Sequence, residues 1–465
     1  MGAIFDAVII GAGPGGYPCA IRLGQLKKKV LVVEACELGG VCLNRGCIPT
    51  KTLSFAAEML ENLQKVQHIG INIANNGLDL TALRNHTEGV VKRLRGGIEY
   101  LFKNNHVEWK KAQAKIISEH KIELKSNDTV EYIEAENIVI ATGTEIIALP
   151  GFEFDGRFIT NTDDALRLDD IPEKLLVVGA GACGLELATI YAALGSKVKI
   201  VEIMEQILPG MEPELCATLF KVLKKKGIEI LLQSTVLDYQ IEGDKINVRI
   251  QGPGISIHED FNRILITVGR KPTNSAFKNF GIECDKKGYI VVDDSYRTNI
   301  RNIFAVGDII GPPLLAHKAT KQGIEVAEII GGLRTNKNSH AIPACVFTIP
   351  PFASVGLTEK EALEQGLKVK IGRFPYRASG KALSMLETEG MVKIVATEEG
   401  KILGIHILGA ESPSLIGEAV LALEQGLKVN DLAEIIHPHP TLTEAIGEAA
   451  ENFYNKAIHI LNSSY

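Results

Sequence analysis

Cysteine is scarce in this chain of 465 residues, which holds eight of them. A small scaffold held by disulfides needs a far higher density of cysteine, so that class is excluded. No apolar stretch reaches the roughly 18 to 20 residues that a membrane-spanning helix needs. The net charge is −6 and no block of lysine and arginine occurs, so we expect neither a nucleic acid nor a membrane as a partner.

The N-terminus lacks the features of a targeting segment. Residues 1–13, MGAIFDAVIIGAG, lead directly into an apolar strand, without a basic region, a signal-peptide core or an Arg/Ser-rich transit segment. Asp6 stands where a myristoylation signal at Gly2 would need Ser or Thr. We therefore expect a reducing, cytoplasmic compartment, although a mature organellar protein whose leader was removed fits the same sequence.

A cofactor motif opens the chain. The apolar run that begins at Ala7 leads into G-x-G-x-x-G at Gly11, Gly13 and Gly16, and a second predicted strand ends at Glu34, 23 positions after the first glycine. The first glycine permits a tight turn, the second lets a pyrophosphate approach the backbone, and the third lets the helix pack on the strand. The helix N-terminus favours phosphate, and Glu34 can accept hydrogen bonds from both ribose hydroxyls.

The same pattern returns 168 residues later, at Gly179, Gly181 and Gly184, with Glu202 again 23 positions after the first glycine. Two ordinary Gly-rich turns would not explain the matched acids, so we predict two dinucleotide-binding domains. A carboxylate at position 202 accepts a free 2′-hydroxyl and repels a 2′-phosphate, so we expect NAD rather than NADP at the second site. The nearby Lys197 and Lys199 soften this expectation.

Two cysteines, Cys42 and Cys47, lie in the segment GGVCLNRGCIPTK (residues 39–51). Zinc would need further Cys or His ligands nearby, and a structural disulfide is not expected in a reducing compartment, which leaves a redox-active pair beside a flavin. Five residues of straight helix rise about 7.5 Å, too far for a disulfide, so Gly46 should break the helix. Cys47 is then expected near the N-terminus of a helix over 51–65, where the helix dipole favours a thiolate. Pro49 interrupts that helix or sits in its first turn.

The other cysteines considered are expected to be small buried hydrophobic residues. They are Cys36, Cys183, Cys216, Cys284 and Cys345.

These motifs together resemble the dihydrolipoamide dehydrogenases, a family of flavoprotein disulfide reductases, along essentially the whole chain. In this resemblance residues 39–51 match the redox-active segment, the first glycine motif the FAD site and the second the NAD site. Residues 138–143 match the turn that links the two domains, residues 297–308 the second FAD motif, residues 315–319 the segment along the flavin edge, and residues 353–359 the start of the interface domain.

The resemblance implies the site residues. Cys42 is the interchange sulfur and Cys47 lies nearer the flavin. Lys51 is placed at the flavin, paired with Glu186. The further residues implied for the cofactors are, for FAD, Thr142, Gly143, Asp308 on the ribityl chain, Ala316 and His317, and, for NAD, Gly269 and Arg270. No metal ion is expected.

Two histidines stand in the segment IHPHPTLTE, residues 436–444. The residues alone leave open whether His439 and Glu444 form a catalytic pair or whether these are surface histidines in a Pro-rich turn. Oxidation of a dithiol releases protons near neutral pH, which suits a histidine whose second ring nitrogen is held by a carboxylate. The resemblance makes His439 the base and Glu444 its partner, and His437 stays outside the catalytic set.

The implied function is the oxidation of protein-bound dihydrolipoamide to lipoamide with reduction of NAD⁺. The implied partners are a second copy of the chain in a homodimer, lipoyl domains, and the acyltransferase of a 2-oxo acid dehydrogenase complex or the carrier protein of glycine cleavage. Other interpretations are a glutathione or mercuric reductase, or a redox-inert nucleotide-binding scaffold. Glu202 disfavours the NADPH-dependent glutathione enzyme, and the absence of cysteine after Cys345 disfavours mercuric reduction.

Four departures from the family pattern stand out. Pro18 lies in the first motif's helix, where the first turn tolerates it. Arg45, between the two cysteines, is a cation that would lower a thiol pKa. Pro351 and the pair Lys321-Gln322 replace more acidic residues.

The predicted architecture is α/β: two Rossmann-like FAD- and NAD(P)-binding domains and a C-terminal α+β dimerisation domain. The predicted limits are an FAD-binding domain over 1–148, an NAD-binding domain over 149–272 with a hairpin-rich insertion near 231–268, a segment over 273–343 that returns to the FAD domain, and an interface domain over 344–465.

Overall fold

A computed structural model describes residues 4–72, 77–127, 129–277, 279–334 and 341–462. These residues divide into two compact units. Unit 1 comprises residues 1–52, 81–147 and 269–339, and unit 2 comprises residues 53–80, 148–268 and 340–465. Residues 149–268 of the predicted NAD-binding segment thus fall in one unit with 344–465, whereas residues 269–272 fall in unit 1, and the predicted domain limits stay a prediction. No helix within the described ranges has the length and apolar character to cross a lipid bilayer.

Unit 1 is built on a mixed sheet with the strand order β3-β2-β1-β6-β5-β4, to which β17 adds alongside β6. Strands β1, β2, β3 and β17 run parallel in it, and β4 and β5 add as antiparallel strands. The strands of this unit are β1 (Phe5–Ile10), β2 (Val30–Glu34), β3 (Val107–Lys111), β4 (Gln113–Ser118), β5 (Lys121–Ser126), β6 (Thr129–Ile140), β7 (Thr144–Ile146), β16 (Arg270–Pro272) and β17 (Ile303–Ala305).

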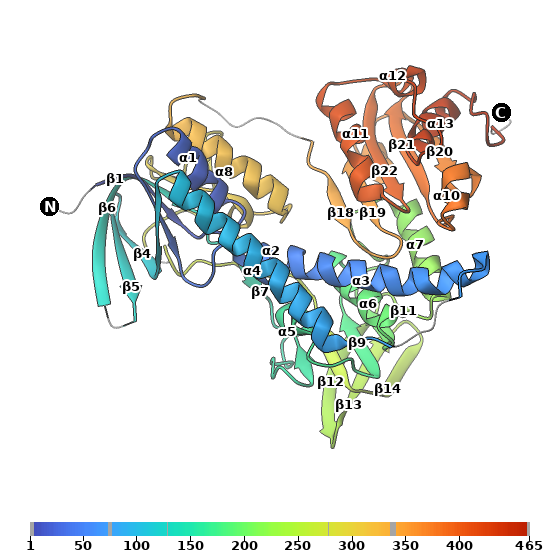
Figure 1. Ribbon diagram of the computed structural model, residues 1–465, viewed down its shortest axis with the longest axis horizontal. Helices are drawn as coiled ribbons and strands as arrows, with labels where there is room; N and C mark the ends of the chain where they lie inside the picture. Colours follow the sequence, from blue (N-terminus) through green and yellow to red (C-terminus); the bar gives the residue numbers. More distant parts are fainter. Residues whose placement is uncertain (1–3, 73–76, 128, 278, 335–340, 463–465) are drawn as a thin grey trace. The chain divides into compact units, whose positions relative to one another are not determined.

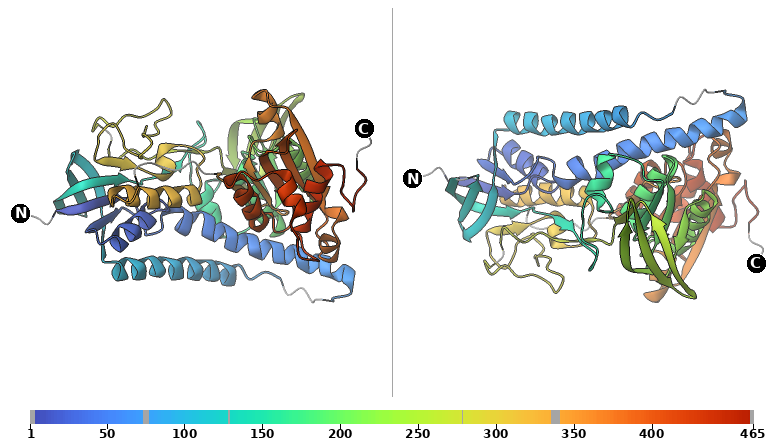
Figure 2. Two further views of the ribbon diagram at one scale, coloured as in Figure 1. Left: turned by 90° about the horizontal axis from the view of Figure 1, so that it is seen from above. Right: turned by 90° about the horizontal axis from the view of Figure 1, so that it is seen from below.

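Both faces of this sheet are covered, which explains why β1 is apolar without alternation. Ala7 and Ile9 belong to the core under the helices, whereas Val8 and Ile10 belong to the core on the other face. Helices α1 and α8 lie side by side (Figures 1 and 2). The helices of this unit are α1 (Gly16–Gln25), α2 (Gly40–Arg45), the first turns of α3 (Cys47–Lys65), α4 (Leu80–Asn104), the 3₁₀ helix η2 (Gly307–Ile310) and α8 (Ala316–Ile330).

Unit 2 contains a parallel sheet with the order β11-β10-β9-β15-β8 and two antiparallel sheets, β12-β13-β14 and β18-β19-β22-β21-β20. Its strands are β8 (Ile159–Thr160), β9 (Lys174–Val178), β10 (Lys197–Val201), β11 (Glu229–Leu231), β12 (Thr235–Glu242), β13 (Lys245–Gly252), β14 (Ile255–Phe261), β15 (Arg263–Ile266), β18 (Ala344–Val346), β19 (Phe352–Gly356), β20 (Val369–Pro375), β21 (Met391–Thr397) and β22 (Ile402–Leu408). The sheet β12-β13-β14 confirms the predicted insertion of hairpins.

The helices of unit 2 pack on these sheets, with α6 beside β9 and β10, and α11 and α13 on the C-terminal sheet (Figure 1). They are, after the remainder of α3, η1 (Val66–Ile69), α5 (Thr162–Arg167), α6 (Ala182–Ala193), α7 (Pro213–Lys225), α9 (Glu359–Glu364), η3 (Tyr376–Ala378), α10 (Gly380–Ser384), α11 (Ser412–Glu424), α12 (Val429–Glu434) and α13 (Glu444–Phe453). The predicted α/β class with a C-terminal α+β region is confirmed.

Candidate active site

The two glycine motifs form turns of the same geometry, one in each unit. Each follows the first strand of a βαβ arrangement, β1-α1-β2 and β9-α6-β10. Gly11 has φ of 101° and Gly179 has φ of 104°, in the left-handed region where a side chain is strained. A Cβ at Gly11 would also lie 2.4 Å from the carbonyl oxygen of Ala141. The backbone at both turns therefore requires glycine at the first position, as the sequence predicted.

The third glycine of each motif lets the helix approach the turn. A Cβ at Gly16 would lie 1.9 Å from the Gly11 oxygen, and one at Gly184 would lie 2.0 Å from the Gly179 oxygen. Because real Cβ atoms do not approach backbone oxygen so closely, any side chain at these positions would push the helix off its strand.

The middle glycines leave room for a ligand. A Cβ at Gly13 would meet only the Gly40 Cα, at 3.9 Å, and one at Gly181 would have no other atom of the described residues within 4 Å. The backbone N–H groups at the starts of α1 and α6 lie beside this space and suit a phosphate. The residues present therefore fit the pyrophosphate groups of two dinucleotides.

The two acids are held alike. Glu34 Oε2 accepts the Ala12 N–H (2.7 Å) and its Oε1 accepts the Cys36 N–H (2.8 Å). Glu202 Oε2 accepts the Ala180 N–H (2.6 Å) and its Oε1 accepts the Met204 N–H (2.8 Å). Each carboxylate is thus fixed at the end of a strand, and each oxygen keeps a second lone pair for a ribose hydroxyl.

Lys197 and Lys199 do not oppose Glu202, because each pairs with carboxylates. Lys197 lies 3.1 Å from Glu173, and Lys199 lies 3.0 Å from Glu229 and also contacts Glu259.

Asp308 lies in η2 of unit 1, in a group of polar side chains. Burial raises the pKa of this carboxyl, while Lys318, Arg270 and a hydrogen bond with Thr144 act in the opposite direction. Arg270, which was predicted to bind NAD, donates to the Thr144 hydroxyl (2.9 Å) and carbonyl (2.8 Å). It therefore lies near Asp308, which was predicted to bind FAD.

The remaining residues predicted for the cofactors also lie in unit 1. Thr142 donates to the Thr273 carbonyl oxygen (2.9 Å), and Gly143 has φ of 66°. Ala316 and His317 open α8, and Gly269 accepts the Ile147 N–H (3.2 Å) beside β7 and β16.

The two cysteines of residues 39–51 lie at a break between helices, as predicted. Helix α2 ends at Arg45, Gly46 leaves helical geometry (φ −145°, ψ −113°), and α3 begins at Cys47. Pro49 stands in the first turn of α3, where its missing N–H costs little. Both cysteines are half-buried free thiols, and their side chains are hydrogen-bonded to each other.

This contact controls the acidity of the pair. The pKa of the Cys42 thiol is raised, first by the hydrogen bond with Cys47 and then by burial, while Lys51 acts in the opposite direction. Arg45, expected to act on the thiols, pairs with Glu37 at 3.4 Å. The contact with Cys47 and burial therefore favour the protonated thiol at Cys42.

The other departures are accommodated. Pro18 is buried in the first turn of an intact α1. Gln322 accepts the Gly307 N–H at 2.9 Å, and the Pro351 carbonyl accepts the Gly409 N–H at 2.9 Å.

The prediction for the remaining cysteines was largely wrong. Cys216 is buried, but Cys36, Cys183 and Cys284 are exposed and Cys345 is half-buried. Cys36 follows Glu34 at the end of β2, and Cys183 lies in the first turn of α6, so both stand at the ligand edge of a sheet rather than in its core.

His439 and Glu444 are brought together in unit 2, with His439 Nδ1 2.8 Å from Glu444 Oε1. The second oxygen of Glu444 accepts the Thr441 N–H at 2.8 Å. Burial acts against ionisation of Glu444, but the hydrogen bonds from His439 and Thr441 hold its pKa below the ordinary value. An ionised Glu444 requires the proton of a neutral His439 on Nδ1, which leaves Nε2 to accept a proton.

Two further His–Glu pairs near this segment were not predicted. His437 Nε2 lies 3.1 Å from Glu418, and His459 Nδ1 lies 2.7 Å from Glu448. For the pair of His459 with Glu448, the available signal was the spacing of Glu444 and Glu448, one turn apart on α13.

Lys51 belongs to unit 1 and Glu186 to unit 2, so their pairing stays a prediction. Lys51 acts electrostatically on Cys42, and Glu186 is buried in α6 and accepts the Phe347 N–H at 2.9 Å.

Comparison with known proteins finds two matching families. Residues 5–323 match the pyridine nucleotide-disulphide oxidoreductase family, and residues 342–450 match the dimerisation domain of the same family.

Curated relatives match almost end to end. The chain is 43% identical to a dihydrolipoyl dehydrogenase of Thermus scotoductus, covering 98% of this chain and 99% of that protein. It is 40% identical to a dihydrolipoyl dehydrogenase of Geobacillus stearothermophilus, covering 98% and 97%. Among solved structures, the Cu(II) complex of the HOCl-induced flavoprotein disulfide reductase RclA from Escherichia coli superposes with a TM-score of 0.86 at 26% identity, covering 97% of this chain and 99% of that one.

Proposed function

Because the chain belongs to the pyridine nucleotide-disulphide oxidoreductase family, we propose that it oxidises protein-bound dihydrolipoamide to lipoamide and reduces NAD⁺. The observation that carries this proposal is the contact of Cys42 with Cys47 at the start of α3, next to a dinucleotide turn. Family membership implies FAD and NAD(P) as cofactors. The dihydrolipoyl dehydrogenases at about 40% identity support the substrate.

The protein's part in the first half-reaction is thiol–disulfide exchange. A thiolate of dihydrolipoamide attacks Cys42 Sγ of the oxidised pair, the Cys42–Cys47 bond breaks, and Cys47 leaves with the bonding electrons. The second substrate thiol then attacks the substrate sulfur of the mixed disulfide. Lipoamide departs with a closed disulfide, and the enzyme keeps two electrons and two protons as a dithiol.

His439 is the proposed base for this exchange. Its Nε2 accepts a proton from a substrate thiol, and Glu444 stabilises the resulting imidazolium through Nδ1–H. When bound, FAD and NAD⁺ supply the hydride transfer that removes two electrons from the enzyme dithiol and yields NADH and a proton. Lys51, one helical turn after Cys47, places positive charge beside the thiol pair.

The proposed nucleotide of the second site is NAD rather than NADP. Both oxygens of Glu202 are held by backbone N–H groups, so the carboxylate cannot swing away from the ribose. A 2′-phosphate would meet this negative charge directly, whereas a 2′-hydroxyl would donate to it.

The proposed partners are a second copy of the chain and the lipoyl domains and acyltransferase of a 2-oxo acid dehydrogenase complex, or the carrier protein of glycine cleavage. The matched dimerisation domain supports the homodimer. Large apolar side chains are exposed within the matched residues 342–450 (Leu421, Ile435 and Ile436) and after them (Ile458 and Leu461). Sedimentation of the holoenzyme tests the dimer. We propose a cytoplasmic location, as expected from the sequence.

The test is an anaerobic assay of the purified flavoprotein with dihydrolipoamide and either NAD⁺ or NADP⁺, following reduced nicotinamide. Fast reduction of NAD⁺, slow reduction of NADP⁺ and loss of both in Cys47→Ser are expected. If the enzyme instead turned over another disulfide with NADPH, dihydrolipoamide would no longer be the proposed substrate. Failure with every dithiol would favour the redox-inert scaffold.

A further inference from the structure

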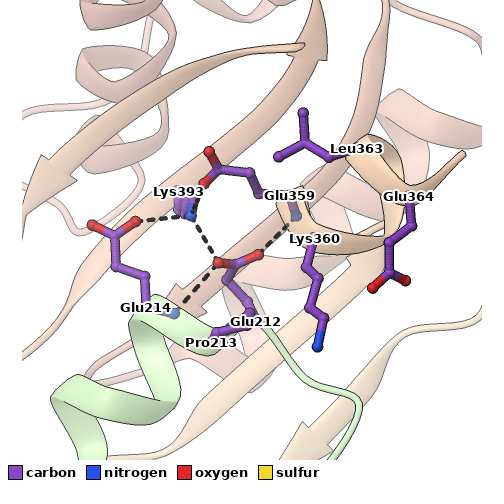
Figure 3. A pocket seen from close by; sticks show the side chains of 8 residues that line it. All are labelled: Glu212, Pro213, Glu214, Glu359, Lys360, Leu363, Glu364 and Lys393. Carbon is purple, nitrogen blue, oxygen red and sulfur yellow. Dashed lines mark hydrogen bonds and ion pairs between the residues drawn. The ribbon is translucent and has the colours of Figure 1, made fainter. Parts of the chain in front are cut away.

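A buried lysine lies among three carboxylates in unit 2, outside the residues that touch the proposed reaction (Figure 3). Lys393 stands in β21 with its side chain 1% exposed, and its Nζ lies 2.7 Å from Glu212, 2.8 Å from Glu214 and 2.6 Å from Glu359. Glu212 and Glu214 belong to the region before and within α7, and Glu359 to α9. We call Lys393 and these three carboxylates the Lys393 cluster.

The positive charges beside the three carboxylates come from side chains of the protein, Lys393 and Arg373. Lys393 Nζ lies among the carboxylate oxygens that are close enough together to hold a metal ion, and Arg373 pairs with Glu214 at 2.9 Å. Burial acts against the Lys393 ammonium, but its carboxylate partners raise its pKa. The lysine is therefore charged and takes the place that a metal ion would occupy.

His406, in the neighbouring strand β22, is neutral beside the cluster. Its Nδ1 accepts the Ser354 hydroxyl (2.5 Å) and its Nε2 donates to the Leu357 carbonyl (3.1 Å). Burial lowers the pKa of His406 to about 4. Glu212, with a side chain 2% exposed and 4.0 Å from His406, thus depends on Lys393 for its positive partner.

Glu212 fixes the start of α7. Its Oε1 accepts the Glu214 N–H (3.4 Å) as the N-cap of the helix, and its Oε2 accepts the Glu359 N–H (3.0 Å). With Lys393 on Oε1, both oxygens of this buried carboxylate are engaged. Position 212 is therefore held by charge and by hydrogen bonds at the same time.

Met211, the residue before Glu212 in the chain, is linked by hydrogen bonds to the second glycine turn. Met211 N–H donates to the Leu208 carbonyl (3.0 Å), and Leu208 N–H donates to the Ala180 carbonyl (2.9 Å). Ala180 N–H in turn donates to Glu202 (2.6 Å). Leu208 is buried and has φ of 48°, a strained conformation that the surrounding contacts must maintain.

We propose that Lys393 is a positioning residue for the nicotinamide nucleotide, acting through Glu212 and the loop over 203–212 on the glycine turn at 179–184. This inference rests on the proposed function, in which that turn binds NAD(H). Loss of the cation frees Glu212 from its buried position, the loop loses its fixed end, and the Ala180 carbonyl loses the Leu208 N–H. The exchange between dithiol and enzyme disulfide uses none of these groups.

The experiment compares Lys393→Met, Lys393→Arg and the control Lys360→Met in the holoenzyme. Lys360 is an exposed lysine that lines the same hollow of about 380 Å³. Two rates are measured by anaerobic stopped-flow: flavin reduction by dihydrolipoamide without nucleotide, and reoxidation by NAD⁺. NADH affinity is measured by titration.

Lys393→Met is expected to weaken NADH binding and raise the KM for NAD⁺ roughly tenfold, with flavin reduction by the dithiol within about twofold of wild type. Lys393→Arg is expected to recover most of the affinity, and Lys360→Met to match wild type. Equal loss of both half-reactions, or unchanged NADH binding, overturns the inference.

Should Lys393→Met fail to fold, Glu212→Gln carries the test, because it removes the ion pair but keeps the size of the side chain. Weaker NADH binding with an unchanged dithiol half-reaction supports the inference, and wild-type NADH affinity overturns it. If the wild-type enzyme itself binds neither NADH nor NADPH, it is the proposed function that fails. If the wild type binds NADH and the variants bind it equally, only the inference fails.

Discussion

The two glycine turns have nearly the same hydrogen bonds, but they differ in the segment of chain that follows the acid and contacts the turn again. We call this segment the returning segment. In both turns, the alanine between the first and second glycines donates its N–H to the acid, Ala12 to Glu34 and Ala180 to Glu202. In both, the carbonyl of that same residue accepts an N–H from the stretch of chain after the acid. The donor is Gly39 in unit 1 and Leu208 in unit 2, each at 2.9 Å.

The segments beyond the two donors are different. After Gly39 the chain enters α2 and the thiol pair, whereas after Leu208 it reaches Glu212, the Lys393 cluster and α7. The same backbone arrangement is therefore followed by the thiol pair in unit 1 and by the Lys393 cluster in unit 2. The two turns thus share their backbone contacts, whereas the segments that follow them have different proposed roles, thiol chemistry in unit 1 and positioning in unit 2.

The largest effect should come from the returning segment of unit 1. Cys42→Ser removes the sulfur that receives the substrate thiolate, so turnover with dihydrolipoamide should fall by about 10⁴-fold or more. Flavin reduction by NADH should persist, because the second turn is untouched. Anaerobic absorbance spectra with each reductant measure both. Loss of reduction by NADH as well would contradict the separation of the two segments.

The next effect concerns the base. His439→Gln should slow flavin reduction by dihydrolipoamide about 10²- to 10⁴-fold, the usual contribution of a positioned base. Reoxidation by NAD⁺ should change little. The matched control is His437→Gln, which alters the neighbouring His–Glu pair. An equal defect in both variants would remove His439 from its assigned role.

Substitution of the two acids, Glu202 and Glu34, tests whether the two turns bind different cofactors. Glu202→Ala should raise the KM for NAD⁺ roughly 10- to 100-fold and reduce discrimination against NADP⁺, because charged hydrogen bonds to the ribose are lost. Glu34→Ala should instead weaken retention of the flavin, measured by its release on dilution. If Glu34→Ala changed the KM for NAD⁺ and Glu202→Ala released the flavin, the two cofactors would have to be assigned to the opposite turns.

The smallest effect is on stability in acid, and it belongs to unit 2. The folded pKa of His406 is about 4, below its ordinary value of 6.5, so the unfolded chain binds a proton first and stability is lost as pH falls below 6.5. The pKa values of Glu212 and Glu214 are also lowered, which adds loss in the same direction at lower pH.

Between pH 7.5 and 5.5 the His406 contribution should be about 1 kcal/mol. Thermal midpoints at the two pH values, compared between wild type and His406→Asn, measure it. A pH dependence that is the same in both proteins would exclude His406 as its source.

The sequence predicted the features that depend on residues near one another in the chain. Glycine spacing and the terminal acids located both turns, and the reach of a disulfide required the break that occurs at Gly46. The Lys393 cluster escaped prediction, because its partners are distant in sequence and their pairing depends on tertiary packing. The available signal was a lysine inside the buried run MVKIVAT, residues 391–397, where a charge needs a partner.

Exposure at the edges of the sheets was also beyond the sequence. Cys36 and Cys183 were expected to be buried like most free cysteines, but both are exposed and follow strands that have already ended. The placement of Arg270 beside Thr144 depends on the pairing of β16 with β7, residues far apart in the chain.

The short span between Cys42 and Cys47 has a consequence for chain entropy. A disulfide stabilises a fold mainly by restricting the unfolded chain, and closing a loop of six residues is worth about 2 kcal/mol, against about 4.7 kcal/mol for a 100-residue loop. Opening a bond of this span therefore costs less than half the stability that opening a 100-residue loop would cost, and the cores of unit 1 do not contain either sulfur. In the proposed cycle, opening and closing the pair would change the free energy of unfolding by only about 2 kcal/mol at each turnover.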